Sequence, residues 1–592
     1  MPVKDSPIVV RTKNDLASLN PADGETVHTL GYAAEGVGAA KYAYHRTGRS
    51  GAASLGYVNH AGSLADDWFE LLHGGRMDLT QAGVVPNNSG AAAANLTAFN
   101  AATGSTAKHF VLPGDTDATT YFFFNPGLTL PAGKTLESYS STHVRMRPAA
   151  QTTAGQIFLT WASDCVIRNI EFQGIPASGS QSLGVGITNA YGASRWRLEK
   201  VRSIQWGIGI QLDNTWIGTL DDCVAQTCSE AALKGVGEEI NHVNLDGGEY
   251  ATSPSCIKLT TGCNSFRVAA SVEGATDLGR GFTVDTDDET IELVGHGFMD
   301  GDKVTFTATG TSPALPSPLD AGTTYYVVNA TSADFQVSLT EGGAAVNLTT
   351  AGSGTLKVFG PAYGIHLTGS AIYNGFVCEG SYFETNKTHH VYADANCVLM
   401  GGSIDNNGFY ASTADQAVKI ARWDGTSLGP GNVYRYTPTN ATEHVYLGPL
   451  CINGVVAPQS RGNQVLGELA EVVDDGANHH LFAPTKPQTL AYATPVAWGV
   501  QKGLSASLTL TGDSTLDKPT GLVAGQTLIL KVKQGAGGSH SLTSYHADID
   551  WGADGAPTLS TGEDEYDILT FVVSDEGGTL KLAAGFKGGF GA

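Results

Sequence analysis

The sequence reads Ile210-Gln211-Leu212-Asp213 and, 23 residues further on, Leu233-Lys234-Gly235. Each segment begins with an apolar residue followed by a polar one, and five other segments repeat the pattern. The seven first residues are Ile187, Ile210, Leu233, Ile257, Ile365, Val391 and Val418, with successive spacings of 23, 23, 24, 108, 26 and 27 residues. A nearly constant period of this size indicates stacked structural repeats.

Side chains alternate between the two faces of a strand, so the first and third residues of each segment point one way and the second points the other. The inner column is apolar and the outer column is polar. This pattern is typical of a parallel β-helix, in which each coil adds a strand to each of about three sheets and the coils stack about 4.8 Å apart. We therefore predict an all-β chain built on a right-handed parallel β-helix (solenoid).

The composition narrows the possible partners. The chain has 592 residues, 75 of them Gly, and a formal net charge of -23, which argues against nucleic acid because nucleic-acid surfaces need clustered Lys and Arg. No apolar stretch approaches the roughly 20 residues needed to cross a bilayer, and the start at Met1 lacks a basic segment followed by an apolar run. We expect a soluble chain without a secretion signal or membrane insertion.

The eight cysteines lie between Cys165 and Cys451, and no pair forms a CxxC motif. Buried thiols in a chain that folds in a reducing cytosol explain this pattern better than a metal site or a disulfide framework. We expect no metal and no cofactor.

Two N-terminal stretches have recognisable patterns. The first is Gly31 to Gly38, and the second is Ala91 to Thr103, which is the clearest helix candidate, with Leu96 and Phe99 at i, i+3 spacing. The first resembles the segment that precedes the β-helix of bacteriophage tail spikes and tail fibres. The second resembles the capping helix of pectate-lyase-like phage proteins, although the acidic loop that precedes the helix there is absent. A helical lid would protect the exposed end of the stack.

The spacing of 108 residues between Ile257 and Ile365 is too large for one coil. Subtracting a coil of about 25 residues leaves about 80, close to the span from Gly281 to Val358. This span carries ten acidic residues against Lys303 and Lys357, and it resembles the small β-domain often inserted in phage tail proteins. Such a domain either helps to bind a partner or stiffens the solenoid.

After about residue 455 the period ends, and longer apolar–polar alternations separated by Gly-rich turns predict a β-sandwich. This stretch resembles the C-terminal domain of phage tail fibres and spikes, including the Lys-Gln-Gly-x-Gly-Gly turn at residues 533–538. The predicted domains are an N-terminal virion-attachment-like region (1–75), capping helix and β-helix (76–280), inserted β-domain (281–358), continued β-helix (359–455) and C-terminal β-sandwich for trimerisation or glycan binding (456–592).

Together these features resemble the bacteriophage tailspike or tail fibre family of the pectate-lyase-like β-helix type. The resemblance implies a homotrimer that is made in the host cytoplasm, joins phage tail or baseplate proteins in the virion and acts at the host cell surface. It also implies a polysaccharide ligand, bacterial or algal, that the protein binds and commonly cleaves. A receptor-binding tail fibre without catalysis is the alternative.

The outer column of the repeats contains residues suited to an acidic polysaccharide. A lyase needs a cation against the uronate carboxylate, a base for the C5 proton and an acid for the leaving oxygen. Lys258, His366 and Tyr392 are our candidates for these three roles. Gln211, Lys234 and Lys419 would bind substrate along the same column. The alternative is that all six simply face solvent on a solenoid sheet.

A second column contains carboxylates, namely Glu273, Glu384 and Asp405, which we expect on successive coils. Neighbours about 4.8 Å apart would match a retaining glycosidase, and Glu273 with Asp405, two coils apart, an inverting one. An endo-glycoside hydrolase is therefore the rival reaction, and we favour the lyase slightly. Alternatively, Asn386 and Asn407 mark coil turns and these carboxylates have no catalytic role. Exposed tryptophans among Trp161, Trp196, Trp206, Trp216 and Trp423 could stack on sugars, although core filling explains them equally well.

Overall fold

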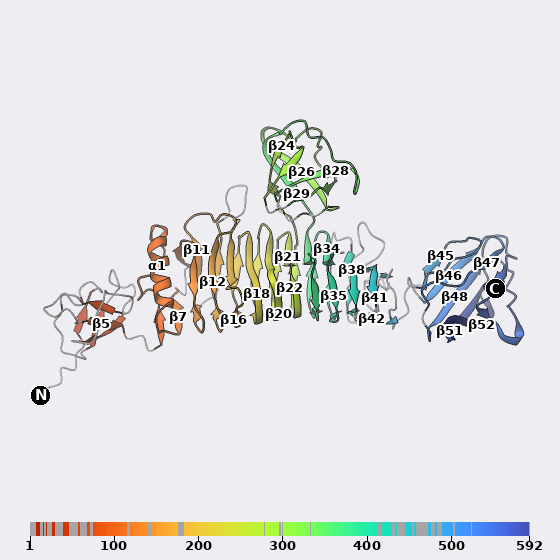
Figure 1. Ribbon diagram of the computed structural model, residues 1–592, viewed down its shortest axis with the longest axis horizontal. Coiled ribbons are helices and arrows are strands. Elements are labelled where there is room, and N and C mark those ends of the chain that lie inside the picture. Colours follow the sequence, from red (N-terminus) through yellow and green to blue (C-terminus); the bar gives the residue numbers. More distant parts are fainter. Residues whose placement is uncertain are drawn as a thin grey trace. The chain divides into compact units, whose positions relative to one another are not determined.

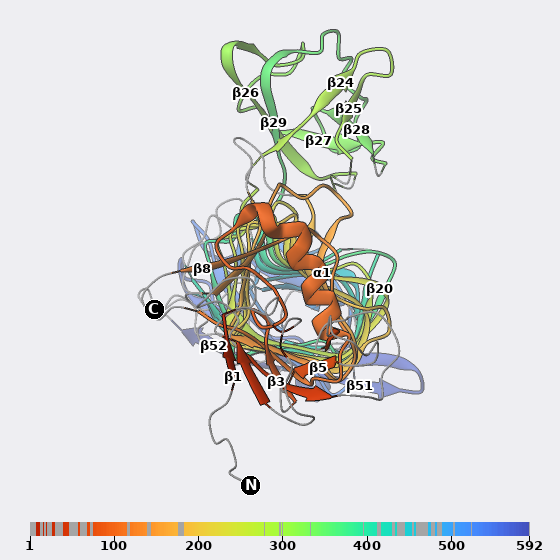
Figure 2. The same cartoon turned by 90° about the vertical axis from the view of Figure 1, so that its left-hand side faces the viewer.

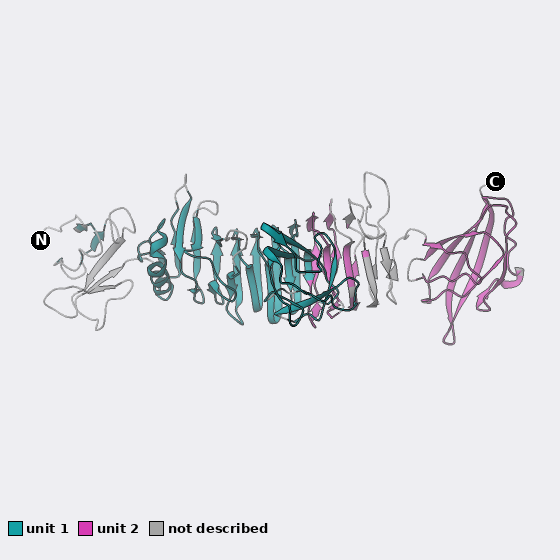
Figure 3. Ribbon diagram, turned by 90° about the horizontal axis from the view of Figure 1, so that it is seen from above, with its two compact units in different colours: residues 1–366 teal, residues 367–592 magenta. Residues whose placement is uncertain are grey.

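The computed structural model describes the chain in residues 8–11, 16, 19, 26–29, 40–45, 57–59, 68–71, 75–114, 119–138, 144–175, 183–277, 279–294, 296, 298, 300–331, 333–394, 396–410, 416–424, 426–428, 432–434, 445–452, 455–456, 472–474, 480–481, 488–500, 504–522 and 524–590. It has two compact units, residues 1–366 and residues 367–592 (Figure 3). Each is described by itself. Among these residues no helix has the length and hydropathy needed to span a bilayer.

The first unit begins with a five-stranded sheet in the order β1-β2-β3-β5-β4. Its strands are β1 (Ile8–Val10), β2 (Thr26–Thr29), β3 (Ala40–His45), β4 (Tyr57–Asn59) and β5 (Trp68–Leu71). The Gly31 to Gly38 stretch lies outside the described residues.

A helix covers the start of the solenoid, as the sequence predicts. Helix α1 (Ala92–Thr103) follows a short 3-10 turn (Ser89–Ala91), and it lies across the first coils in Figure 2. Phe99 is fully buried against Phe124, and the buried Asn95 amide donates 2.9 Å hydrogen bonds to Val85 O and Phe123 O. The amide therefore joins the loop before the helix to the second strand of the first coil.

The solenoid of the first unit consists of parallel strands, each paired with its counterparts one coil earlier and one coil later (Figure 1). The strands are β6 (Arg76–Asp78), β7 (His109–Leu112), β8 (Thr120–Phe124), β9 (Leu128–Leu130), β10 (Thr135–Ser138), β11 (Val144–Pro148), β12 (Ile157–Trp161), β13 (Val166–Arg168), β14 (Glu171–Gln173), β15 (Val185–Asn189), β16 (Ser194–Glu199), β17 (Arg202–Ile204), β18 (Ile208–Asp221), β19 (Val224–Gln226), β20 (Ala231–Ala251), β21 (Ser255–Leu259), β22 (Gly262–Glu273) and β30 (Tyr363–Leu367). The predicted all-β parallel solenoid is thus confirmed.

One corner of the coils repeats in structure. Gln205, Thr227, Thr252 and Gly274 have φ values of 65°, 58°, 51° and 63° at equivalent positions of successive coils. The amide of each of the first three donates to a carbonyl of the following coil. A single left-handed residue turns the chain from one sheet to the next, so every coil leaves in the same direction and its inward apolar residues stack.

The inserted part of the first unit is a seven-stranded antiparallel sheet in the order β23-β29-β26-β27-β28-β25-β24. Its strands are β23 (Arg280–Gly281), β24 (Thr283–Asp285), β25 (Thr290–Glu292), β26 (Lys303–Ala314), β27 (Tyr325–Val328), β28 (Asp334–Ser338) and β29 (Ser353–Phe359). It has its own apolar core, which includes Phe306, Phe335 and Val358. The inserted β-domain predicted from the long spacing is present.

The second unit also begins with parallel coils. The strands are β31 (Ile372–Asn374), β32 (Val377–Glu379), β33 (Tyr382–Glu384), β34 (His389–Ala393), β35 (Val398–Met400), β36 (Ser403–Asp405), β37 (Gly408–Phe409), β38 (Gln416–Asp424), β39 (Ser427–Leu428), β40 (Val433–Tyr434), β41 (Val445–Ile452), β42 (Val455–Val456), β43 (Val472–Asp474) and β44 (His480–Leu481). Val445 pairs with Val472, and Val455 pairs with His480. The prediction that the period ends near residue 455 is therefore wrong, because strands of two or three residues are too short to show the alternation.

The C-terminal part of the second unit has a six-stranded sheet in the order β45-β46-β48-β51-β52-β50 and a two-stranded sheet of β47 and β49. The strands are β45 (Gln488–Leu490), β46 (Ser505–Leu510), β47 (Ser514–Leu516), β48 (Thr527–Gln534), β49 (Leu542–Tyr545), β50 (Ile549–Asp550), β51 (Tyr566–Glu576) and β52 (Thr579–Phe590). Both sheets contribute to one core that includes Leu516, Leu530 and Phe571, as expected for a β-sandwich.

Candidate functional site

The predicted outer column forms a ladder within each unit. In the first unit Thr188 pairs with Gln211, Gln211 with Lys234 and Lys234 with Lys258. In the second unit Tyr392 on β34 pairs with Lys419 on β38. Steps between neighbouring strands are about 4.8 Å, so each unit presents its side chains one coil apart.

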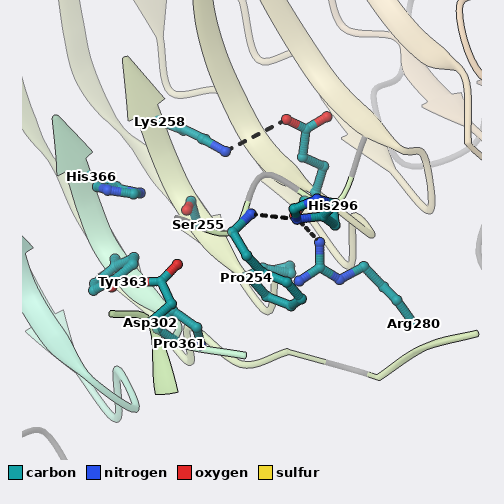
Figure 4. Close-up of a pocket in the computed structure, with 11 residues that line it drawn as sticks. Pro254, Ser255, Lys258, Arg280, His296, Asp302, Pro361, Tyr363 and His366 are labelled. Carbon is teal, nitrogen blue, oxygen red and sulfur yellow. Dashed lines mark hydrogen bonds and ion pairs between the residues drawn. The ribbon is translucent and has the colours of Figure 1, made fainter. Parts of the chain in front are cut away.

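A small pocket lies where this ladder approaches the inserted domain, in the first unit. The cavity has a volume of about 30 Å³ and is lined by Glu230, Pro254, Ser255, Lys258, Arg280, His296, Phe298, Asp302, Pro361, Tyr363 and His366. Figure 4 shows Lys258 and His366 reaching it from the solenoid strands, opposite Arg280 and His296. A water needs at least about 10–15 Å³ of such space, so the pocket holds two waters or one carboxylate group but no sugar ring.

Lys258 is the most unusual group in the pocket. Lys258 is 9% exposed, and its Nζ lies 3.8 Å from Glu230 Oε1, which is too far for a hydrogen bond. The same oxygen lies 2.5 Å from Lys234 Nζ. Burial lowers the pKa of Lys258, and the nearby Glu230 carboxylate offsets this only in part. Within the described residues the Lys258 ammonium makes no hydrogen bond.

Glu230 stays ionised beside these lysines. Burial alone would raise the pKa of Glu230, but the attraction of Lys258, Lys234 and Arg280 together outweighs burial and lowers it. Lys234 therefore takes the Glu230 carboxylate as its hydrogen-bond acceptor, and the N–H donors of the Lys258 ammonium stay available for a group in the pocket.

His366 and Tyr363 lie side by side on β30, with ring centroids 4.4 Å apart. Both are nearly buried and both line the pocket. The sequence analysis predicted His366 and did not select Tyr363. Every residue of β30 is buried, so no alternation marks Tyr363 as a pocket residue, and the inserted domain that covers it cannot be placed from the sequence.

The inserted-domain side of the pocket is held by structural hydrogen bonds. His296 Nδ1 accepts from Phe298 N at 3.0 Å and Nε2 lies 3.2 Å from Asp334 O, so the ring is neutral with its proton on Nε2. Burial lowers the pKa of His296 in agreement. The Arg280 guanidinium lies 4.1 Å from the centroid of the Phe298 ring and donates to His296 O. His296 therefore shapes the loop and is not poised to move a proton.

A buried carboxylate joins the two chain crossings at the root of the inserted domain. Asp277 accepts from Gly279 N at 3.0 Å and from Gly360 N at 2.8 Å, and it pairs with Arg280 at 3.2 Å. A Cβ at Gly360 would collide with the Phe298 ring. These contacts fix Arg280 and Phe298 against the pocket.

Tyr392 and Lys419 belong to the second unit. Both side chains are half-buried, and the Tyr392 ring lies 5.3 Å from the His389 ring. The roles predicted for Tyr392 as acid and Lys419 as substrate ligand stay predictions.

The predicted carboxylate column is wrong in its alignment. Asp405 on β36 pairs with Glu379 on β32, whereas Glu384 lies on β33, whose partner strand is β37. Glu384 accepts a 2.5 Å hydrogen bond from the Tyr382 hydroxyl. Glu379 and Glu384 lie on two different strands of one coil, separated by a corner at Gly380, where φ is 73°. Strands of three residues look alike in sequence, so the pattern does not show which carboxylate pairs with Asp405.

Glu273 closes β22 in the first unit and pairs with Ala251. The carboxylate near it on the preceding coil is Glu249, whose pKa is raised by burial and by the Glu273 charge. Glu273 Oε1 accepts from Ser271 Oγ at 2.9 Å.

Glu379 and Asp405 of the second unit stand in register on neighbouring coils, as do Glu199, Asp221 and Asp246 of the first unit. Ser403 Oγ donates to Glu379 Oε1 at 2.5 Å. Sequence reasoning missed Glu379.

Most of the solenoid tryptophans fill the core. Trp161, Trp206 and Trp423 are fully buried and Trp196 is 2% exposed, whereas Trp216 is 37% exposed. Seven of the eight cysteines, Cys165, Cys223, Cys228, Cys256, Cys263, Cys378 and Cys397, are free and buried, as predicted. No group of three His, Cys, Asp or Glu side chains in the described ranges could hold a metal ion.

Solved structures of phage tailspikes are similar to this chain at low identity. Tailspike gp42 of Acinetobacter phage vb_AbaP_AS12 is 10% identical, covers 98% of this chain and 92% of its own, and has a TM-score of 0.45. The enzymatically active domain of tailspike protein 2 from bacteriophage CBA120 is 11% identical over 98% of this chain and 80% of its own, with a TM-score of 0.43.

A bacterial enzyme is also similar. The mannuronan C-5 epimerase AlgE4 A-module of Azotobacter vinelandii is 10% identical over 78% of this chain and 98% of its own, with a TM-score of 0.33. No protein-family model and no curated protein matches the sequence. At these identities and TM-scores no substrate or reaction carries over from these proteins to this chain.

Proposed function

We propose that this protein binds an acidic polysaccharide along the outer ladder of its solenoid and cleaves it by β-elimination at the pocket beside the inserted domain. The observation that carries this proposal is the buried Lys258 ammonium, which has no hydrogen-bond acceptor among the residues that the structure describes and shares a carboxylate-sized cavity with His366. Gln211 and Lys234 continue the ladder from Lys258, so a chain of sugars has polar contacts beyond the reacting residue.

The chemistry assigns one step to each group. Lys258 pairs with the uronate carboxylate, which stabilises the negative charge that develops when the C5 proton leaves. Neutral His366 accepts that proton. The leaving glycosidic oxygen takes a proton from the hydroxyl of Tyr363, whose ring centroid lies 4.4 Å from that of His366.

The test is to incubate the protein with uronate-containing polysaccharides and to record the ultraviolet absorbance of unsaturated products alongside new reducing ends. Absorbance with reducing ends supports elimination. His366→Gln should abolish both signals while the exposed Lys303→Met control retains them. If His366→Gln cleaves at the wild-type rate, His366 is not the base.

Hydrolysis is the second candidate, and the register of Glu379 with Asp405 favours it. Neighbouring coils place these carboxylates at a spacing close to the roughly 5 Å of a retaining glycosidase. Reducing ends without absorbance, lost in Glu379→Gln and Asp405→Asn, would support this reaction. Retained hydrolysis in both variants would exclude the pair, and Glu384→Gln tests the carboxylate that the sequence selected.

The oligomeric state and the place of the protein in a phage particle are part of the same proposal. The resemblance of the C-terminal sandwich and of the N-terminal stretch to phage tail proteins supports a homotrimer that joins the virion tail, partners tail or baseplate proteins and acts at the host cell surface. Light scattering of the purified full chain tests the trimer. A protein that binds the polysaccharide but releases neither product would be a receptor-binding fibre.

A further inference from the structure

An exposed aromatic ledge on the first unit contains none of the residues that line the pocket. Tyr191 lies between β15 and β16, and Trp216 lies on β18 one coil later, where it pairs with Ser194. Tyr191 is 62% exposed, Trp216 37% and the adjacent Ile217 56%. The other solenoid tryptophans are buried in the core, so the position of Trp216 is not explained by core filling.

The backbone holds these rings in place. A Cβ at Gly192, where φ is 77°, would lie 3.5 Å from Trp216 Cζ3, so the indole rests against the turn that carries Tyr191. Trp216 N donates to Ala193 O at 3.1 Å. Ile217 has a φ of 53°, the left-handed corner conformation that Arg195 and His242 adopt at the equivalent positions of the neighbouring coils.

Two carboxylates border the ledge. A Cβ at Gly237 would lie 2.5 Å from Asp213 Oδ1, so the Asp213 carboxylate lies over the residue that precedes Glu238. The Glu238 carboxylate beside the Tyr191 hydroxyl raises the pKa of Tyr191, and burial raises the pKa of Asp213. Asn189 fixes the Asp213 backbone through bonds of 2.8 Å to its N–H and 2.6 Å to its carbonyl.

The ledge is continuous with the polysaccharide ladder. Asp213 stands two residues after Gln211 on β18, so both side chains leave the same face of the strand, about 7 Å apart. A glycan bound at Gln211 and Lys234 therefore reaches the ledge with a neighbouring sugar.

We propose that Tyr191, Trp216, Asp213 and Glu238 form a subsite for a sugar ring that carries no carboxylate, either a neutral hexose or a hexosamine. The aromatic faces contact the C–H face of the ring, and the two carboxylates accept hydrogen bonds from its hydroxyl or amide groups. The same carboxylates repel a uronate. This inference rests on the proposed function and deepens it, because it predicts that the polymer alternates acidic and non-acidic sugars.

The experiment measures binding by titration calorimetry, with N-acetylglucosamine oligomers and uronate oligomers of equal length added to the full-length protein. We expect the hexosamine oligomer to bind and Trp216→Ala to weaken its Kd about tenfold or more. Tyr191→Ala should weaken it in the same direction. Tyr492→Ala, which removes a 41% exposed tyrosine from the second unit, should leave it unchanged.

Three results would overturn the subsite. The first is that the wild-type protein shows no detectable binding of the hexosamine oligomer, or that Trp216→Ala binds it as tightly as wild type. Another is uronate binding that depends on Trp216 to the same degree. The third is a change of oligomeric state in Trp216→Ala, measured by light scattering, because it would assign the ledge to contact with a second copy of the chain.

The cleavage assay separates this inference from the proposed function. Hexosamine binding that depends on Trp216, in a protein that cleaves no uronate polymer, supports the subsite and contradicts the lyase. Uronate cleavage without hexosamine binding supports the lyase and contradicts the subsite.

Discussion

The Lys258→Met variant distinguishes a functional lysine from a structural one. The Nζ to Oε1 distance of 3.8 Å to Glu230 corresponds to a Coulomb attraction of about 4 kcal/mol at an effective dielectric constant of about 20. Burial nevertheless lowers the pKa of Lys258, so the free-energy cost of removing the ammonium from water is larger than this attraction. Loss of the charge should therefore not lower the free energy of unfolding, and methionine keeps most of the buried stem.

We expect the free energy of unfolding of Lys258→Met to stay within about 1 kcal/mol of wild type or to rise, because Glu230 keeps Lys234 at 2.5 Å. The kcat/KM for a uronate polymer should fall about 100- to 1000-fold, as when one stabilising donor is removed from an active site. Urea unfolding and the absorbance assay measure the two quantities.

Lys234→Met is the matched control, one coil away on the same ladder. It removes the close partner of Glu230 and leaves only Lys258 at 3.8 Å, so the free energy of unfolding should fall by about 1–3 kcal/mol. A loss of several kcal/mol in Lys258→Met, or an unchanged kcat/KM, would refute the reasoning. In either case Lys258 would be a structural partner of Glu230.

Three further predictions concern stability. Asp277→Asn leaves one of its two backbone donors, Gly279 N or Gly360 N, without an acceptor, which should cost about 1–3 kcal/mol of local stability. Hydrogen exchange at Gly279 and Gly360 should therefore become faster, and unchanged exchange would show that Asp277 does not hold the two chain crossings together. Burial lowers the pKa of His390 to about 3 from 6.5, so the unfolded chain binds the proton more strongly and stability, complete above pH 6.5, falls as the pH drops toward 3. Urea midpoints at a series of pH values should show a weaker decline in His390→Gln. Asn407→Ala removes a 2.8 Å bond to Cys378 O and a 3.1 Å bond to Asn432 and should lower the thermal midpoint; an unchanged midpoint would show that water replaces the amide.

The carboxylate column shows where the sequence pattern reaches its limit. The 23- to 27-residue period aligns Gln211, Lys234 and Lys258 correctly, because every coil adds the same strand and alternation assigns each side chain a face. Glu384 and Asp405 were aligned wrongly, since short strands around a corner of two residues look alike in sequence. Asn407 likewise stacks its buried amide on Asn432, and the left-handed residue beside it is Asn406.

The amino-acid sequence by itself determined the all-β solenoid, its helical lid, the inserted domain and the polar ladder, because these depend on local alternation and on a period that repeats along the chain. Tertiary structure alone decided the pocket and the ledge. Lys258 loses its solvent because a domain inserted after it covers it, and Tyr191 meets Glu238 across two coils. Burial and contacts between distant residues depend on which surfaces fold together, and no local pattern encodes them.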